Sequence, residues 1–262
     1  MPGVDIQNIS FSYDGCSRVL EKIDLHIDEG EFVCILGQSG CGKSTLLRLI
    51  AGLEKCSSGQ IIVDGKAIEG AGLERGVVFQ DYGLFPWMTA GANIVLALKK
   101  KFPALSKTEL KDRTLELLKS VGLDESVYNK YPRELSGGMK QRCAIAIAFG
   151  IDPPILLMDE PFGALDAVTR SMLQDMVSGL WREQIQRKTI FFVTHDVDEA
   201  LLLANRIIVL GQSPSSVICD LRIPEDKRVS RDRYFEDAEV LKLRNDLIRY
   251  IHADIRRHVK EM

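Results

Sequence analysis

Apolar and polar residues follow different periods in different parts of this chain of 262 residues. Residues 20–27 alternate between apolar and polar, which is typical of a strand with one exposed face. Residues 32–36 and 155–158 are continuous apolar runs, which predict buried strands of a parallel sheet. From about residue 84 to residue 152, apolar residues recur with helical spacing instead. The pattern therefore predicts a sheet framework that contains a helical insertion.

Turn and cap signals mark where the predicted elements begin and end. Gly52 is placed to end the first helix, and Ser106 with Glu109 forms a capping box that opens a later one. Strands that alternate with helices favour right-handed crossovers and a parallel sheet with both faces covered. The predicted strands are 6–13, 20–27, 32–36, 60–64, 76–80, 155–159, 189–194 and 206–210. Later helices are predicted at about 166–186, at 199–204 and near the C-terminus. The last of these carries apolar residues from Leu241 to Ile255 on one face.

The segment from residue 37 to residue 45 follows a predicted buried strand and leads into an amphipathic helix, and it fits G-x-x-x-x-G-K-[ST]. Glycines let several backbone N–H groups point into one concavity at the positive end of a helix, where phosphate oxygens bind. Lys43 is placed to reach the β- and γ-phosphates, and the Ser44 hydroxyl to bind Mg²⁺. The candidate phosphate-binding residues are Gly37, Gln38, Ser39, Gly40, Cys41, Gly42, Lys43, Ser44 and Thr45.

The composition narrows the class of protein. A net charge of −3 gives no support for broad binding of nucleic acid or anionic membranes. No apolar run approaches the ~18 residues needed to span a bilayer, and the first residues do not resemble a secretory signal. Six scattered cysteines without a C-x-x-C pair indicate reduced cytosolic thiols. We expect the thiol pKa of Cys41 to be lowered, because this residue lies at a helix N-terminus. A redox role is the alternative to the favoured interpretation, in which Cys41 is a tolerated small residue of the loop.

Two acidic residues end the apolar run at 155–158. An aspartate at the carboxyl end of a buried strand, here Asp159, can hold Mg²⁺, and the adjacent Glu160 can polarise a water for attack on a γ-phosphate. The alternative is a strand that ends in a solvated acidic turn. The presence of the segment 37–45 favours the catalytic interpretation.

Ser136, Gly137 and Gly138 open a predicted helix that runs through Ala148. A serine and two glycines at a helix N-terminus can form a second phosphate-binding surface, although such a sequence on its own is usually only a helix cap. Here it belongs to an ordered series of motifs. That series resembles the nucleotide-binding subunit of ABC transporters over nearly the whole chain, up to about residue 220.

The resemblance implies roles for three further side chains. Tyr13 lies where the family stacks an aromatic ring on adenine. Gln80 matches the glutamine that contacts Mg²⁺ and the attacking water. His195 matches the switch histidine that contacts the γ-phosphate. Taken singly, Tyr13 could be a packing residue, and Gln80 and His195 could be solvated surface groups.

The resemblance also implies a dimer. Residues 135–142 match the signature motif, which in this family touches the γ-phosphate held by the other protomer. Residues 163–166 match the D-loop, with Asp166 near the nucleotide, and residues 155–160 match Walker B. Each ATP would therefore lie between two copies of the chain, related by a two-fold axis. The signature helix departs from the family at Ile147, where an arginine is usual.

Three segments resemble one branch of the family, the importer ATPases for nitrate, sulfonate and taurine. They are residues 70–79, 84–89 and 165–170. In that branch the segment 84–89 forms part of a groove that grips a helix of the membrane subunit, and we expect Phe85, Trp87 and Met88 to be exposed there. The alternative is that these side chains pack the core of the insertion.

The resemblance implies an α/β fold: a P-loop NTPase (RecA-like) core with a mainly parallel sheet, an N-terminal antiparallel β-subdomain and an inserted α-helical signature subdomain. We expect a nucleotide-binding domain over 1–225, with the helical subdomain at about 84–152, and a C-terminal helical extension over 226–262.

The expected function is ATP hydrolysis, with Mg²⁺, that powers import of a small anion. The expected partners are a second copy, integral-membrane permease subunits and, through them, an extracytoplasmic solute-binding protein, at the cytoplasmic face of the cell membrane and without nucleic acid. One alternative is a soluble ABC ATPase that acts on nucleic acid or ribosomes, but the chain has neither a second ATPase half nor a coiled-coil insertion. A regulatory module with an idle ATPase is disfavoured by the presence of Glu160 and His195.

Overall fold

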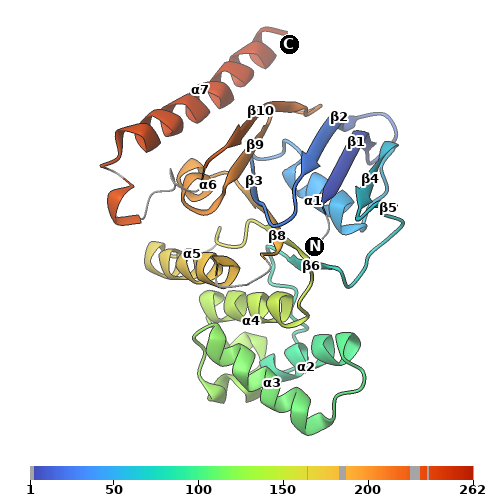
Figure 1. Ribbon diagram of the computed structural model, residues 1–262, viewed down its shortest axis with the longest axis vertical. Helices are drawn as coiled ribbons and strands as arrows, with labels where there is room; N and C mark the ends of the chain where they lie inside the picture. Colours follow the sequence, from blue (N-terminus) through green and yellow to red (C-terminus); the bar gives the residue numbers. More distant parts are fainter. Residues whose placement is uncertain (1–2, 164, 183–186, 225–230, 235, 262) are drawn as a thin grey trace. The chain divides into compact units, whose positions relative to one another are not determined.

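The chain folds into two compact units, which are described separately. The computed structural model describes residues 3–163, 165–182, 187–224, 231–234 and 236–261, with side chains described as far as Arg256. The first unit comprises residues 1–72 and 184–262, and the second comprises residues 73–183 (Figure 1). In the described part of the chain, no helix has the length and apolar character needed to cross a membrane.

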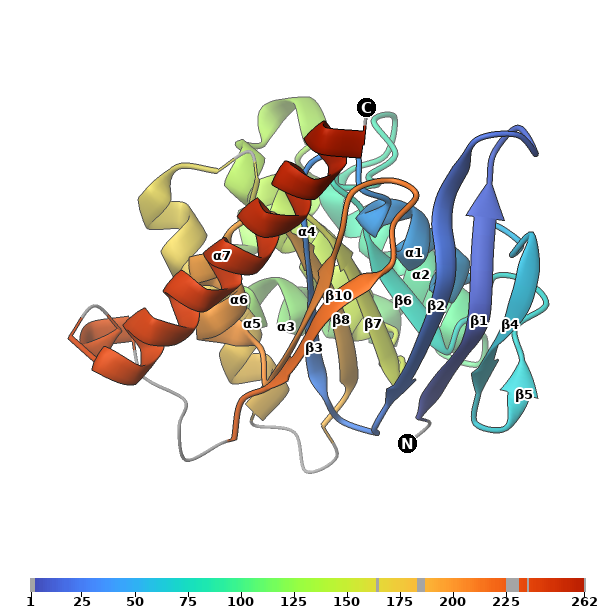
Figure 2. The same cartoon turned by 90° about the horizontal axis from the view of Figure 1, so that it is seen from above.

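A parallel sheet forms the centre of the first unit. Strand β3 (Phe32–Leu36) lies between β8 (Thr189–Thr194) and β9 (Arg206–Leu210) and runs parallel to both. All residues of these strands are buried, as their continuous apolar sequences predict. An unpredicted strand, β10 (Val217–Arg222), pairs antiparallel with β9 at the edge (Figure 2). Its side chains are half-buried or exposed, and its apolar run is only three residues long, Val217 to Cys219, before Asp220 interrupts it.

The first unit also contains the predicted N-terminal antiparallel sheet. Its strand order is β2-β1-β4-β5. Val4 pairs with Ile27 on one side and with Val63 on the other. The strands are β1 (Val4–Ser12), β2 (Arg18–Ile27), β4 (Ser58–Val63) and the short, unpredicted β5 (Lys66–Ala67).

Among the described residues, the first unit has three α-helices. Helix α1 (Lys43–Ala51) ends at Gly52, whose φ of +73° is left-handed and whose N–H donates to the carbonyls of Arg48 and Leu49. A Cβ there would lie 2.3 Å from the carbonyl oxygen of Gly70, so both the turn and the close approach require glycine. The other two helices, α6 (Val197–Leu203) and α7 (Ala238–Glu261), contact each other, and α7 also contacts β10 (Figure 2).

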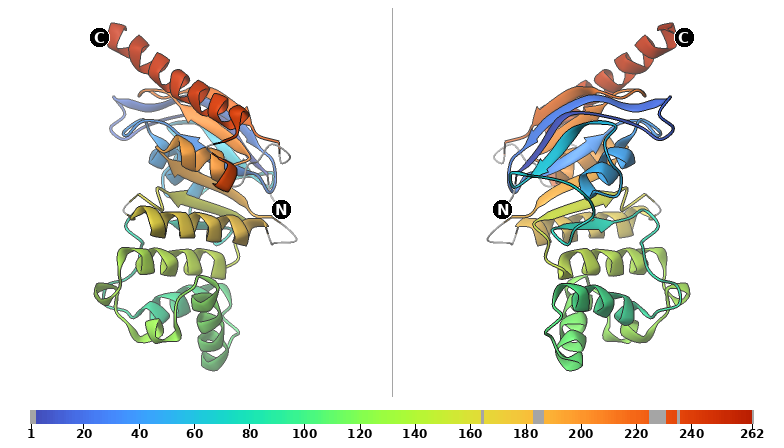
Figure 3. Two further views of the ribbon diagram at one scale, coloured as in Figure 1. Left: turned by 90° about the vertical axis from the view of Figure 1, so that its left-hand side faces the viewer. Right: turned by 90° about the vertical axis from the view of Figure 1, so that its right-hand side faces the viewer.

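The second unit contains the predicted helical insertion and two parallel strands. Helices α2 (Ala90–Lys101), α3 (Lys107–Ser120) and α4 (Gly137–Gly150) pack on one another, and they are the green helices of Figure 3. The capping box of α3 is confirmed: Glu109 N–H donates to Ser106 Oγ at 3.2 Å, and Ser106 N–H donates to the Glu109 carboxylate at 2.7 Å. Strand β6 (Arg75–Val78) ends two residues earlier than predicted, and it pairs with β7 (Ile155–Asp159). Helix α5 (Ala167–Arg182) covers most of its predicted length; residues 183–186 lie outside the described residues. Short 3₁₀ turns lie at Glu125–Asn129 and Pro132–Glu134 in this unit, and at Arg231–Arg233 in the first unit.

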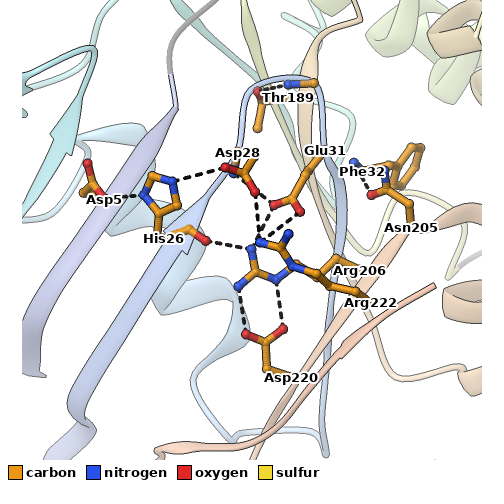
Figure 4. Close-up of polar contacts among 11 residues, drawn as sticks. Asp5, His26, Asp28, Glu31, Phe32, Thr189, Asn205, Arg206, Asp220 and Arg222 are labelled. Atoms are coloured by element: carbon orange, nitrogen blue, oxygen red, sulfur yellow. Dashed lines mark hydrogen bonds and ion pairs between the residues drawn. The ribbon is translucent and has the colours of Figure 1, made fainter. Parts of the chain in front are cut away.

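A buried ion-pair network ties together the amino ends of the parallel strands in the first unit (Figure 4). The Arg206 guanidinium, 5% exposed, donates to both oxygens of Asp220 at 2.8 Å and to Glu31 at 2.9 Å. It also donates to the carbonyl of His26 at 2.6 Å. Around it, Arg222 pairs with Asp28 at 2.9 Å, at the exposed rim. This network holds β3, β9 and β10 in register at the end opposite the segment 37–45.

Candidate functional site

The segment 37–45, hereafter the P-loop, connects β3 to α1. Gly40 and Gly42 have left-handed φ angles of +81° and +98°. A Cβ on Gly42 would approach a methyl carbon of Leu20 to 2.8 Å, and one on Gly37 would lie 2.7 Å from the Cys41 sulfur. Glycine is therefore required for both conformation and space, and the N-terminus of α1 follows directly, without a side-chain cap, as in anion-binding loops.

Lys43 lies within the curl of the P-loop. Its side chain is buried, and its ammonium donates to the carbonyl oxygens of Gly37 at 3.0 Å and Gln38 at 2.9 Å. These bonds hold the positive charge beside the backbone that the glycines shape. A buried ammonium beside backbone N–H groups and a helix N-terminus suits an anion such as a triphosphate.

The expectation that the thiol pKa of Cys41 is lowered is wrong. Burial raises the pKa of this thiol above its ordinary value, and the opposing charge of Lys43 is the smaller influence. The sulfur packs against Gly37 and is 2% exposed. Cys41 is thus a small packing residue of the loop in its thiol form, and it is not an activated thiolate.

Tyr13 lies next to the P-loop helix. Its ring is 58% exposed and packs edge-on against Phe11, with centroids 4.7 Å apart. Its hydroxyl lies 3.1 Å from Thr45 Oγ1. The structure therefore brings an exposed aromatic face and the P-loop together within the first unit, as a site for a base and its phosphates requires.

His195 lies in a short connection between β8 and α6, and its side chain is exposed. The connection is fixed by its neighbours. Thr194 Oγ1 donates to the buried Glu199 carboxylate at 2.6 Å and accepts from the N–H of Asp196 at 3.0 Å. Asp196 in turn caps α6, accepting from Asp198 and Glu199 N–H. These supporting residues were not predicted, although an aspartate directly before a helical pattern is a recognisable cap signal.

Asp159 and Glu160 end strand β7 in the second unit. Asp159 is buried, and Glu160 is half-buried. Glu160 has a φ of +41°, in the left-handed region that glutamate rarely adopts. Such a conformation costs on the order of 1–3 kcal/mol, and it is found mostly where function requires it.

The signature residues open α4 in the second unit. Ser136 is the N-cap of α4, and its Oγ accepts from the N–H of Met139 at 3.2 Å. A Cβ on Gly138 would lie 2.7 Å from the Thr169 methyl group, so close packing on α5 requires glycine there. The helix-cap role is therefore present, and Ser136 also remains exposed at the helix N-terminus. Ile147 lies further along α4 and is half-buried.

Asp166 stabilises the start of α5. Its carboxylate accepts from the N–H of Thr169 at 3.0 Å, and this bond is the largest influence that lowers its pKa. The side chain is exposed, and Gly163, at the other end of the predicted D-loop, is exposed as well. Ala164 lies outside the described residues.

Gln80 is exposed, and residues 81–89 that follow it are exposed or half-buried. Phe85 and Trp87 are 43% and 71% exposed, and their rings lie 5.3 Å apart. Met88 is half-buried, so the expectation that it is exposed is wrong. Asn93, which sequence reasoning missed, is buried and holds the segment: it accepts from the N–H of Phe85 and donates to the carbonyls of Phe85, Met88 and Thr89.

The candidate residues fall into two sets. The first unit carries the P-loop, Tyr13 and His195, and the second carries Gln80, Asp159, Glu160, Ser136 to Gly138 and Asp166. A buried parallel strand, a glycine loop with an inward lysine and a helix N-terminus define a P-loop nucleotide-binding protein.

Comparison with known proteins gives the family. Residues 20–163 match the ABC transporter family. The chain is 44% identical to the nitrate import ATP-binding protein NrtD of Synechococcus elongatus, over 89% of this chain and 84% of that protein. It is 41% identical to the bicarbonate transport ATP-binding protein CmpD of the same species, over 96% of this chain and 91% of that protein. The chain belongs to the ABC transporter family and is an ATP-binding subunit with ATPase activity.

Solved structures agree with this assignment. A dimeric ATP-binding cassette, MJ0796, in a post-hydrolysis state bound to ADP and Pi matches with a TM-score of 0.76 and 35% identity, over 84% of this chain and 99% of that one. A second dimeric structure of the same bacterial ABC transporter cassette matches with a TM-score of 0.77. The predicted P-loop NTPase fold is confirmed.

Proposed function

We propose that this chain is the ATP-hydrolysing subunit of an importer for a small anion, which it powers through a partner membrane permease. The observation that carries the proposal is the P-loop with its inward Lys43, in a chain that is similar to NrtD and CmpD over most of its length. Both relatives are named for transport, which favours this function over a soluble ATPase that acts on nucleic acid or ribosomes. The chain would act as a peripheral subunit at the cytoplasmic face of the membrane.

The first unit would bind most of the nucleotide. The backbone N–H groups of the P-loop and the Lys43 ammonium would hold the phosphates, and Tyr13 would stack on the base. The His195 side chain, on the connection that Thr194 and Asp196 fix, would contact the γ-phosphate.

The second unit would supply the hydrolytic groups. Glu160 would orient and accept a proton from the attacking water, next to Gln80. The oxygen donors of Ser44, Gln80 and Asp159 suit Mg²⁺, which prefers hydroxyl, carbonyl and carboxylate ligands. When bound, Mg²⁺ would neutralise charge that develops on the phosphates.

The arrangement of the motifs supports a dimer. Ser136, Gly137 and Gly138 lie exposed or half-buried at the N-terminus of α4, where they can meet the γ-phosphate held by a second copy. Asp166 would contribute at the same interface. We assign residues 1–225 to the nucleotide-binding domain, with the helical subdomain at about 84–152, and residues 226–262 to a C-terminal extension. Residues 225–230, at this boundary, lie outside the described residues.

The substitution Glu160→Gln tests the catalytic assignment. It should leave ATP binding intact, lower phosphate release about 10²–10⁴-fold, and accumulate a dimer in the presence of ATP and Mg²⁺. Phosphate release and size-exclusion chromatography measure both effects. The control is Glu116→Gln, an exposed acid on α3 in the same unit. Near-normal phosphate release by Glu160→Gln would remove Glu160 as the catalytic carboxylate.

The permease contact would lie on the exposed aromatic pair Phe85 and Trp87, which Asn93 holds in place. An exposed pair of aromatic rings in contact, on a fixed backbone, suits an apolar helix of a partner. Through the permease, the complex would also include an extracytoplasmic solute-binding protein. Trp87→Ala should weaken co-purification with the permease and leave ATP binding unchanged. Tyr250→Ala, an exposed aromatic on α7, is the control; unchanged assembly of Trp87→Ala would exclude this docking site.

A further inference from the structure

The C-terminal helix α7 is connected to the P-loop by a chain of hydrogen bonds. The connection passes through the loop between β9 and β10, residues 211–216, hereafter the β9–β10 loop. All of these segments belong to the first unit. Figure 2 shows α7 lying beside β10 and α6.

The first step joins α7 to the β9–β10 loop. The Asp254 carboxylate accepts from the backbone N–H of Gln212 at 2.7 Å. A Cβ on Gly211 would lie 3.1 Å from the same carboxylate, so the loop backbone approaches Asp254 closely. A carboxylate that accepts from a backbone N–H makes a charge-assisted bond, which is stronger than a neutral one.

The second step joins the β9–β10 loop to the P-loop. Gln212 Nε2 donates to Gln38 Oε1 at 2.6 Å. Ser215 Oγ lies within hydrogen-bonding distance of the carbonyl oxygens of Cys41 and Gly211, and it can donate to one of them at a time. The loop therefore holds the P-loop both at the Gln38 side chain and at its backbone.

The third step reaches the lysine. The carbonyl oxygen of Gln38 accepts from Lys43 Nζ at 2.9 Å and from the N–H of Cys41 at 3.3 Å. Gln38 therefore makes both contacts: its side chain accepts a hydrogen bond from Gln212, and its backbone carbonyl accepts one from Lys43. Any change in the position of Gln38 changes the support of the Lys43 ammonium.

Helix α7 is itself firmly attached at its other end. Arg244 Nε, on α7, donates to the Asp198 carboxylate of α6 at 2.7 Å, and Tyr234 Oη, which precedes α7 in the chain, donates to the same carboxylate at 2.6 Å. Leu247 is buried at 1% exposure between these contacts and Asp254. Because the helix is anchored, Asp254 is presented to the β9–β10 loop from a fixed position.

We propose that Asp254 is a positioning residue of the nucleotide site, which holds the P-loop in its ATP-binding conformation through Gln212 and Gln38. The C-terminal helix is then part of the nucleotide-binding machinery, and a partner or truncation that displaced it would weaken ATP binding. The proposal rests on the proposed function only in that the P-loop binds ATP. It assigns a role to a segment that lies beyond the matched residues 20–163.

The test is a substitution at Asp254 on the full chain. Asp254→Ala should raise the KM for ATP and the Kd for a fluorescent ATP analogue roughly 5- to 20-fold, with kcat at saturating ATP within about twofold of wild type, because Glu160 is untouched. Asp254→Asn keeps an oxygen acceptor for the Gln212 N–H and should restore most of the affinity. Asp246→Ala is the matched control, since this aspartate lies on the same helix and pairs with Arg249.

A second variant tests the same path from the loop. Gln212→Met keeps the length of the side chain but removes the donor to Gln38, and it should weaken ATP binding by a similar factor. In the double variant with Asp254→Ala, the fold increase in the Kd for ATP should be smaller than the product of the two single increases, since both substitutions act through Gln38. The effects of independent sites would instead multiply.

The outcomes separate this proposal from the proposed function. ATP affinity of Asp254→Ala within twofold of Asp246→Ala would overturn it, as would equal loss in Asp254→Asn, or a fall in kcat that matches the rise in KM. If Asp254→Ala does not fold, Gln212→Met provides the test: ATP affinity within twofold of Asp246→Ala would overturn the proposal. Failure of the proposed function would show in wild type and Asp246→Ala, as absent ATP binding or hydrolysis, whatever the Asp254 variants do.

Discussion

The two ends of the parallel strands in the first unit differ in what they present. At the carboxyl ends of β3 and β8, the chain offers glycines, backbone N–H groups, one buried lysine and an exposed histidine. At the amino ends of β3 and β9, it buries Arg206 between Asp220 and Glu31 (Figure 4). At the carboxyl ends, glycines with left-handed φ angles shape a loop that can hold a ligand. At the amino ends, the charged side chains pair with one another. The difference predicts that substitutions at the two ends will separate function from stability.

The largest effect on stability is expected at the amino ends. Arg206→Met removes the buried partner of Glu31 and of the more exposed Asp220, and it should lower the free energy of unfolding by about 2–3 kcal/mol. ATP affinity of the folded protein should not change. Urea denaturation measures the first quantity and nucleotide titration the second. Arg222→Met, which removes an exposed pair with Asp28 and a longer contact with Glu31 at 3.6 Å, is the control and should cost at most about 1 kcal/mol. A loss below about 1 kcal/mol for Arg206→Met would contradict the structural role of this network.

The reverse result is expected at the carboxyl ends. Lys43→Ala should lower the rate of ATP hydrolysis by about 10²–10³-fold, because an ammonium aimed at the phosphates is lost. The free energy of unfolding should fall by only about 1 kcal/mol, since the carbonyls of Gly37 and Gln38 lose one donor. Lys66→Ala, at an exposed site in the same unit, controls for loss of charge. A loss of stability in Lys43→Ala as large as that in Arg206→Met would contradict the proposed separation of function from stability between the two ends.

A smaller effect on ATP binding is expected at Tyr13. Tyr13→Ala should weaken ATP binding by about 1–3 kcal/mol, the usual contribution of one base stacked on an aromatic ring. Tyr13→Phe keeps the ring and loses only the contact with Thr45, so its affinity should stay within about threefold of wild type. A titration with a fluorescent ATP analogue distinguishes them. Equal losses in the two variants would assign the effect to the hydroxyl and not to stacking.

The smallest effect concerns pH. The hydrogen bond from Arg206 is the largest influence that lowers the pKa of Asp220. Its folded pKa is therefore below the unfolded value of about 3.9, so its stabilisation is present above that pH and is lost as pH falls through the folded pKa. Asp220→Asn should reduce the dependence of unfolding free energy on pH below about pH 5, and leave it unchanged near pH 7. If the unfolding free energy of Asp220→Asn depends on acid pH as in wild type, the ion pair with Arg206 does not lower the pKa of Asp220.

The sequence predicted those features that depend on neighbouring residues. The P-loop, the buried strands β3, β7 and β8, and the capping box of α3 each follow from a short local pattern, and the structure confirms them. The family resemblance was also carried by short motifs, and the comparisons confirm it.

Features that depend on distant residues were missed. Gln212 and Asp254 are 42 positions apart, and Arg206 and Glu31 are 175 positions apart, so no local pattern pairs them. The Cys41 prediction failed because the helix N-terminus is visible in sequence but burial is not, and burial has the larger influence on the pKa. Strand β10 was missed because its side chains face partly into solvent.

The left-handed conformation of Glu160 has a consequence for how this chain tolerates change. Glycine adopts a φ of +41° without steric penalty, so Glu160→Gly would relieve backbone strain while it removes the carboxylate assigned to catalysis. If Glu160 is the catalytic carboxylate proposed above, selection for thermal stability alone would then favour an inactive protein at this position. Any effort to stabilise the chain by consensus or by directed evolution should hold residue 160 fixed, and any mutational scan should score stability and turnover separately there.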